Sequence, residues 1–242
     1  NTFNQTFDPQ ISVSSGYTTI YLQTGYVRNT GLELSLGYGH TWNNNFRWDS
    51  NFTLSHNKNK IKELVRDYVH PETGELINKD RLDVGGLGKA RFILKEGGTL
   101  GDLYTQSDLK RDDNGMVDID PTGIVAIENN LPDIKLGSVF PKANLAWSNH
   151  FSWKGISLSA LFTARIGGIV YSATEAAMDQ YGVSERSALA RDNGGVLVNN
   201  RTLVDAQNYY TTIGSESGLP QYYTYNATNV RLQEASIGYL IP

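Results

Sequence analysis

Side chains that could hold a metal ion gather in one short acidic stretch of the chain. The stretch contains Asp112, Asp113, Asn114, Asp118 and Asp120. Carboxylate and amide oxygens of this kind are the ligands that Ca²⁺ prefers. An EF-hand loop, however, needs a glutamate at its twelfth position, and counting from Asp112 that position holds Gly123. We therefore interpret the stretch as a solvated acidic turn, keep calcium binding as the alternative, and expect neither a metal site nor a cofactor.

The sequence offers no recognisable arrangement of catalytic residues. The chain contains no cysteine, so a thiolate nucleophile is excluded. Its four histidines are scattered, without the i, i+4 spacing of a helical zinc site. No serine lies in a Gly-x-Ser-x-Gly elbow, and no spacing pairs two carboxylates for glycosidase chemistry. We therefore predict that the chain is not an enzyme.

Aromatic side chains that could bind a ligand are concentrated late in the chain, in a stretch that reads as a long loop. They are Tyr209, Tyr210, Tyr222, Tyr223 and Tyr225. Tyrosine combines a large apolar ring with a polar tip, so these residues could contact a substrate or grip the surface of a partner. They could equally pack the loop against itself. Both interpretations stay open.

Two stretches alternate strictly between apolar and polar residues and predict two-faced β-hairpins. In the first, Leu32, Leu34 and Leu36 alternate with Glu33 and small residues, and a return strand starts near residue 46. The second pairs residues 143–153 with 156–171. Successive side chains of a strand point to opposite faces, so the charged and amide residues of both hairpins should share one face. They are Glu33, Arg47, Asp49, Asn144, His150 and Arg165, and we expect them to face a barrel lumen or a plug.

The spacing of the predicted strands favours a barrel. Further strands are expected at about 91–95, 100–109 and 230–241, where a phase shift near Gln233 indicates a bulge. Residues 1–20 read as loop, 61–65 as a helical turn, and 173–190 as one or two short helices. Tight turns therefore alternate with long connections, which is typical of an antiparallel transmembrane β-barrel with short periplasmic turns and long extracellular loops. A soluble extracellular β-sandwich that acts as a binding or adhesion module is the alternative.

Composition narrows the possible partners. A net charge of −4 gives no basic footprint, so we expect no nucleic-acid partner. No run approaches the roughly 18 apolar residues of a membrane-spanning helix, and no signal peptide opens the chain. The alternating strand at the end of the sequence stops abruptly. We expect residues 1–242 to be part of a single barrel domain. Taken alone, this part of the barrel would have unpaired strand edges and would not be stable.

Four blocks, taken in order, resemble a known family. They are 26–34 with 48–60, then 94–104 with its Glu-Gly-x-x-Leu-Gly pattern, then 151–162 with Gly167-Gly168, and finally 227–239 with Val-Arg-Leu. Together they resemble the C-terminal part of the barrel of SusC-like TonB-dependent transporters. The family's plug domain, N-terminal strands and last strands have no counterpart in this sequence.

The resemblance implies a function and a set of partners. It implies import of a large nutrient, an oligosaccharide or a peptide, across the bacterial outer membrane, with the chain crossing that membrane several times. The implied partners are a SusD-like surface lipoprotein, TonB acting through the absent plug region, and the lipid of the outer membrane. These implications concern the whole transporter.

Overall fold

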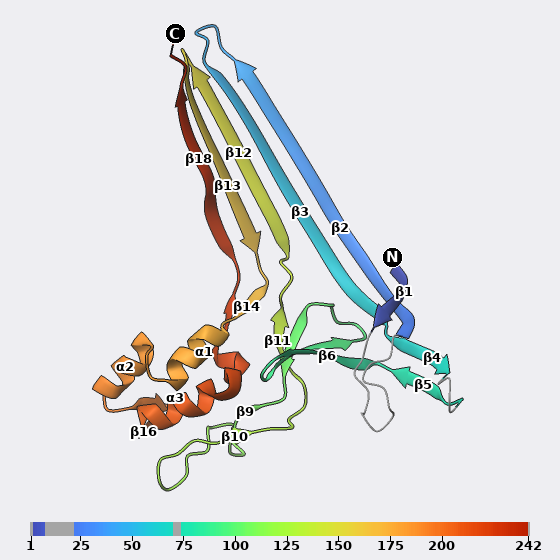
Figure 1. The fold of residues 1–242 in the computed structure, drawn as a ribbon, viewed down its shortest axis with the longest axis vertical. Coiled ribbons are helices and arrows are strands. Elements are labelled where there is room, and N and C mark those ends of the chain that lie inside the picture. The colour runs from blue at the N-terminus through green and yellow to red at the C-terminus, as the bar shows by residue number, and fades with distance from the viewer. Residues whose placement is uncertain (1, 8–21, 70–73, 242) are drawn as a thin grey trace.

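A long antiparallel sheet forms the body of the structure, a computed structural model that describes residues 2–7, 22–69 and 74–241 (Figure 1). The strands lie in the order β1-β2-β3-β12-β13-β18. Their bounds are Thr2–Phe7 for β1, Leu22–Thr41 for β2, Arg47–Glu63 for β3, Ala143–Trp153 for β12, Ile156–Ile166 for β13 and Asn229–Tyr239 for β18. The five strands from β2 to β18 rise well clear of the rest of the molecule (Figure 1).

The two ends of this sheet differ as the sequence predicts. At one end β2 turns into β3, and β12 into β13, through tight turns that need a left-handed backbone at Asn45 and at Lys154-Gly155. At the other end two long excursions leave the sheet, residues 64–142 and 167–228 (Figure 1). The alternation of tight turns with long connections is thus confirmed.

The first excursion builds a small sheet. Its strands are β4 (Val65–Val69), β5 (Leu76–Lys79), β6 (Arg81–Leu87), β7 (Ala90–Lys95), β8 (Asp102–Thr105), β9 (Asp108–Leu109), β10 (Ile127–Glu128) and β11 (Ile134–Ser138). Four of them pair in the order β11-β8-β7-β6. The strand predicted at 91–95 is confirmed as β7, and the strand predicted at 100–109 is divided into β8 and β9. The helical turn predicted at 61–65 is wrong, because Ile61 instead exchanges backbone hydrogen bonds with Gly97 and Gly98 and joins a buried cluster with Leu64 and Leu94.

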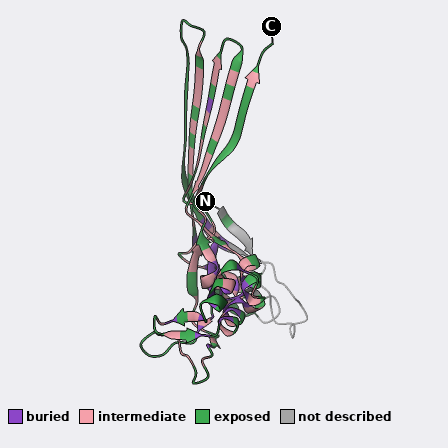
Figure 2. Ribbon diagram, turned by 90° about the vertical axis from the view of Figure 1, so that its left-hand side faces the viewer, coloured by how far each residue is buried: buried purple, intermediate pink, exposed green. Residues whose placement is uncertain are grey.

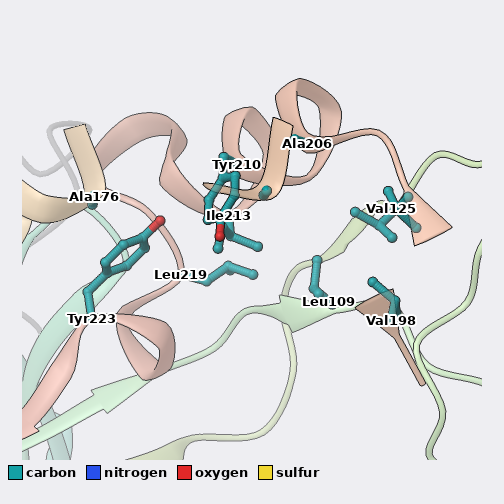
Figure 3. Close-up of a cluster of buried hydrophobic side chains, with 11 residues drawn as sticks. Leu109, Val125, Ala176, Val198, Ala206, Tyr210, Ile213, Leu219 and Tyr223 are labelled. Carbon is teal, nitrogen blue, oxygen red and sulfur yellow. The ribbon is translucent and has the colours of Figure 1, made fainter. Parts of the chain in front are cut away.

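The second excursion folds into a helical module. It contains β14 (Ile169–Tyr171), α1 (Ala173–Gln180), α2 (Glu185–Asp192), β15 (Val196–Val198), β16 (Thr202–Val204), α3 (Ala206–Gly214) and β17 (Thr224–Asn226). Each helix starts at a polar N-cap whose side chain accepts a backbone N–H, namely Ser172, Ser184 and Asp205. The short helices predicted within 173–190 are confirmed. The loop predicted beyond them instead contains α3, and Ile213 of α3 lies in the same hydrophobic core as Leu109 of β9 (Figure 3).

Three smaller differences and one agreement concern the long strands. β1 occupies part of the predicted N-terminal loop, β3 runs on to Glu63, and the strand predicted at 156–171 divides at Gly167-Gly168, where both residues have positive φ. The bulge predicted near Gln233 is confirmed: the register of β13 against β18 shifts between the pairs Leu161–Glu234 and Phe162–Leu232. Among the described residues, no helix is both long and apolar enough to cross a membrane.

Candidate functional site

The register of the long sheet gives it one apolar face. Residues paired directly across strands share a face, so one row crosses all five strands from Leu36 in β2 to Leu232 in β18. That row is Leu36, Phe52, Trp147, Phe162 and Leu232, and the row beside it is Leu34, Leu54, Leu145, Ala164 and Val230. Large apolar side chains of both rows are exposed: Leu36 is 57% exposed and Val230 72%. The strands that carry them are coloured as exposed or intermediate along most of their length (Figure 2).

The height of the apolar face matches the hydrocarbon core of an outer membrane. On β2 it runs from Leu32 to His40, eight residue steps or roughly 26 Å at about 3.3 Å per step. Barrels of the outer membrane present an apolar band of about 25 Å. Beyond Leu32 the same face carries the charged pair Arg28 and Lys60. The apolar face therefore ends where a membrane would end.

Polar groups on the apolar face are satisfied by tryptophan. The indole Nε1 of Trp48 donates to Oδ1 of Asn149 at 3.0 Å, and the Nε1 of Trp147 donates to Oγ of Ser50 at 2.9 Å. Unpaired polar groups are costly in hydrocarbon, so these contacts fit a lipid-facing surface. Near the tight turns, aromatic rings lie within contact of one another, namely Tyr38, His40, Trp42, Phe46, Trp48 and Phe151. Aromatic girdles occupy the membrane–water interface in such barrels.

The opposite, polar face holds all six polar residues that the sequence singles out. One row joins Glu33, Ser55, Asn144, Arg165 and Asn229, and another joins Asp49, His150, Ser159 and Ser236. The guanidinium of Arg47 donates two hydrogen bonds, of 2.6 and 2.8 Å, to the carboxylate of Asp49. Nδ1 of His150 lies 2.7 Å from Oγ of Ser159. The strand pairing also places Arg231 and Glu234 on this face, two residues that are not among the six predicted from the sequence. That the polar face lines a lumen stays a prediction.

The loop tyrosines are packed mostly into the helical module. Tyr223 is fully buried and Tyr210 nearly so, while Tyr209 and Tyr222 are partly buried against the same core (Figure 3). Burial raises the pKa of the Tyr223 phenol, and the neighbouring Asp179 carboxylate raises it further. Of the two interpretations left open by the sequence, the burial of Tyr210 and Tyr223 favours the one in which they pack the loop against itself. Tyr225 is 41% exposed, and a ligand could reach its ring.

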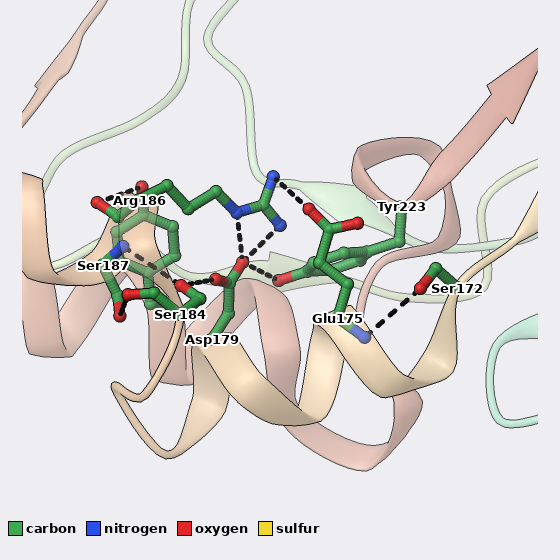
Figure 4. A network of polar contacts seen from close by, with 8 residues as sticks. Ser172, Glu175, Asp179, Ser184, Arg186, Ser187 and Tyr223 are labelled. Atoms are coloured by element: carbon green, nitrogen blue, oxygen red, sulfur yellow. Dashed lines mark hydrogen bonds and ion pairs between the residues drawn. The ribbon is translucent and has the colours of Figure 1, made fainter.

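A buried polar network ties the helices of the module together (Figure 4). Asp179 of α1 accepts hydrogen bonds from Nε of Arg186 at 2.8 Å, from Oγ of Ser184 at 2.5 Å and from the phenol of Tyr223 at 2.9 Å. Glu175 lies 3.4 Å from the same guanidinium. Burial opposes the charge of Arg186, but the bonds to Asp179 outweigh it and raise the pKa of Arg186. Single-sequence reasoning missed this network, although the Ser184 cap signals its start.

A second polar network fixes the small sheet. The nearly buried carboxylate of Asp133 accepts from Nε of Arg81 at 2.7 Å and from Gln106 at 3.0 Å, and pairs with Lys95 at 2.8 Å. The hydrogen bond from Arg81, with a further contribution from Lys95, holds the pKa of the Asp133 carboxyl well below its usual range. The network thus joins β6 and β7 to the chain that leads into β11.

Replacing Asp133 with asparagine is expected to destabilise the small sheet by about 2 kcal/mol, because hydrogen bonds to a charged group are lost. The pKa of Asp133 is lowered by folding, so its stabilisation is present above the unfolded pKa of about 4 and fades only as pH falls below it. Hydrogen exchange of β6 and β7 in the full-length protein, between pH 5 and 8, should show the loss at every pH. Equal protection in wild type and Asp133→Asn would contradict this role.

The acidic stretch forms two successive turns. Asp112 Oδ1 accepts the backbone N–H groups of Asn114 and Met116, and Asp120 does the same for Thr122 and Ile124. Asp118 forms an ion pair with Lys110 at 2.7 Å. Within the described part of the chain, no three His, Asp or Glu side chains come together as metal ligands. The geometry therefore fits the interpretation as solvated turns.

Comparison with known proteins gives consistent matches. No protein-family model matches the chain. TonB-dependent receptor P26 of Formosa agariphila is 27% identical over 68% of this chain and 17% of its own length, and TonB-dependent receptor P3 of the same organism is 24% identical over 94% and 23%. The solved structure of the RagAB peptide transporter superposes with a TM-score of 0.67 at 18% identity, covering 99% of this chain and 26% of that chain.

This chain therefore spans about a quarter or less of the proteins that it matches. The RagAB peptide importer in its open-open state gives a similar match, with a TM-score of 0.61 over 99% of this chain. The fold shared with RagAB is a mostly antiparallel β-architecture. The sequence matches, the shared β-fold and the four resembling blocks together support the resemblance of this chain to a fragment of a SusC-like TonB-dependent transporter.

Proposed function

We propose that the full-length protein imports a large nutrient across the bacterial outer membrane, using energy delivered through TonB. In this proposal the five long strands are part of the wall of a single barrel domain, and the two excursions are its extracellular loops. The observation that carries the proposal is the continuous, exposed apolar face, about 26 Å high, backed by a polar face. A soluble β-sandwich would bury such a face against a second sheet, so the exposure of Leu36 and Ile237 argues against that alternative.

The proposed partners are a SusD-like surface lipoprotein that covers the extracellular loops, TonB, and the surrounding lipid. The RagAB match supports an assembly of this kind, and RagAB itself is a peptide transporter. For this protein we propose an oligosaccharide or a peptide as cargo. Import of either would need a polar wall along the path, which the face that carries Glu33, Asp49 and His150 would supply.

Uptake by cells that carry the full-length gene tests this proposal. Cells should lose growth on one class of oligosaccharide or peptide when the gene is deleted, and should regain it when the gene is restored. Growth should also fail when TonB is removed while the transporter is retained. Growth that survives both deletions on every such nutrient, or a full-length protein that fractionates as soluble without detergent, would contradict the proposal.

A further inference from the structure

An uncharged recess lies on the polar side of the long sheet, close to its loop end. We call it the amide recess. Its cavity volume is about 450 Å³, and its wall includes Asn29, Ser55, Asn57, Asn59, Asn144 and Phe140. Asn29 pairs with Asn59 across β2 and β3, and Ser55 pairs with both Glu33 and Asn144, so these residues share the face of Glu33. The recess would therefore open toward the interior of the barrel.

Two of the amides in the recess are available to a ligand. Asn59 is fixed by its neighbours: its Nδ2 donates to Oδ1 of Asn29 at 2.8 Å, and its Oδ1 accepts the backbone N–H of Leu100 at 3.0 Å. The side-chain amides of Asn57 and Asn144 form no hydrogen bond within the described part of the chain, and both residues are exposed. Each can offer an acceptor oxygen and two donor hydrogens. The fixed pair Asn29–Asn59 thus supports two free amides beside it.

An aromatic ring borders the recess on the side of the loops. Phe140 is 46% exposed, although it is a large apolar residue far from the apolar face of the sheet. Its ring lies against Gly101, where an added Cβ would come within 2.8 Å of two ring carbons. A glycine at this position is therefore required for the ring to occupy its place. The ring thus packs on the backbone at Gly101 and also lines the cavity.

The chemistry of the wall points to a neutral ligand. Paired amide donors and acceptors match neighbouring hydroxyl groups, an aromatic face packs on the apolar side of a sugar ring, and no charged side chain lines the recess. We propose that the amide recess binds a sugar unit of a neutral oligosaccharide, an inference that rests on the proposed import function and names its cargo. Asn57 and Asn144 bind the hydroxyl groups, and Phe140 stacks on the ring.

Binding to the purified full-length transporter in detergent tests this assignment. The probes are a set of neutral oligosaccharides of about five to eight units and a set of uncharged peptides of similar length. The wild type should retain at least one oligosaccharide. The double variant Asn57→Ala/Asn144→Ala should bind it about ten- to thirtyfold more weakly, since two hydrogen bonds of about 1 kcal/mol each are lost. Phe140→Ala should weaken binding, and Phe140→Tyr should restore it.

The matched control is Asn51→Ala, on the same face of β3 and six residues from Asn57, or about 20 Å away. It should bind the oligosaccharide as the wild type does. Equal affinity in the double variant, or retention of peptides instead of oligosaccharides, would overturn the assignment. Because nutrient-dependent growth is measured separately, a transporter that supports growth but binds no neutral oligosaccharide refutes the recess and leaves the import function standing.

Discussion

Replacing Leu36 with arginine is expected to prevent assembly of the full-length protein in the outer membrane. Leu36 lies midway along the apolar face of β2, with Phe52 beside it on β3. A charged side chain at the midplane of a barrel's lipid face costs about 2–4 kcal/mol. Domains are typically stable by only about 5–15 kcal/mol, and assembly intermediates by less, so this cost is large. The amount of transporter in the outer-membrane fraction, and its resistance to unfolding in detergent gels, would report the effect.

The adjacent position provides the control. Ser35 lies on the same strand but on the polar face, opposite Thr53, and it is exposed. Ser35→Arg introduces the same charge one residue away, on the side that would face water, and should leave assembly close to wild type. If both variants assemble equally well, the apolar face does not meet lipid. If Ser35→Arg alone fails, the two faces are reversed.

The long strands could be predicted from sequence because their signal is local. Alternation along a single strand determines its two faces. It is therefore enough to predict that Glu33, Asp49 and His150 lie on the polar faces of their strands, which the pairing of the strands joins into one face. The tight turns were equally local, since Asn45 and Gly155 adopt the positive φ that such turns demand. Even the bulge at Gln233 is visible as a change of phase.

The strand at 91–95 and the short helices within 173–190 could be predicted, but most of the structure of the two excursions could not, because it depends on distant partners. The local sequence around Ile61 predicts a helical turn. In the structure its backbone N–H donates to the carbonyl of Gly98, and its side chain packs in a buried cluster with Leu94. Asp133 finds Arg81 across 52 residues of sequence. Tertiary contacts of this kind override local propensity, and nothing in the neighbouring residues announces them.

The tyrosines show the same limit at the candidate site. A tyrosine in a polar stretch can contact a ligand or pack into a hydrophobic core. Which of the two it does depends on whether its hydroxyl finds a buried hydrogen-bond partner. Tyr223 meets Asp179, which itself depends on helices α1 and α2 packing together. The amide recess could not be predicted for a related reason. Asn57 and Asn144 are 87 positions apart in the sequence, and they come together only through the pairing of β3 with β12.

Replacing Asp179 with alanine is expected to destabilise the helical module by about 3 kcal/mol. Removing one partner of a buried ion pair typically costs about 3–5 kcal/mol, and Arg186 is 36% exposed, so part of its charge regains water. The variant would also remove the acceptor of the Ser184 and Tyr223 hydroxyls. Hydrogen exchange of the backbone between 173 and 223 in the full-length protein should show faster opening, by about a hundredfold, while β12 and β13 keep their protection.

A matched variant and a double variant distinguish loss of the ion pair from a general destabilisation of the helical module. Glu175→Gln removes the weaker and more exposed partner of Arg186, at 3.4 Å, and should cost less than about 1 kcal/mol. Asp179→Ala combined with Arg186→Met should cost less than the sum of the two single substitutions, because no charge is then left buried without its partner. Additive effects would mean that the two side chains do not depend on each other. Since these side chains join α1, α2 and the segment before β17, strong coupling would mean that these three segments unfold cooperatively.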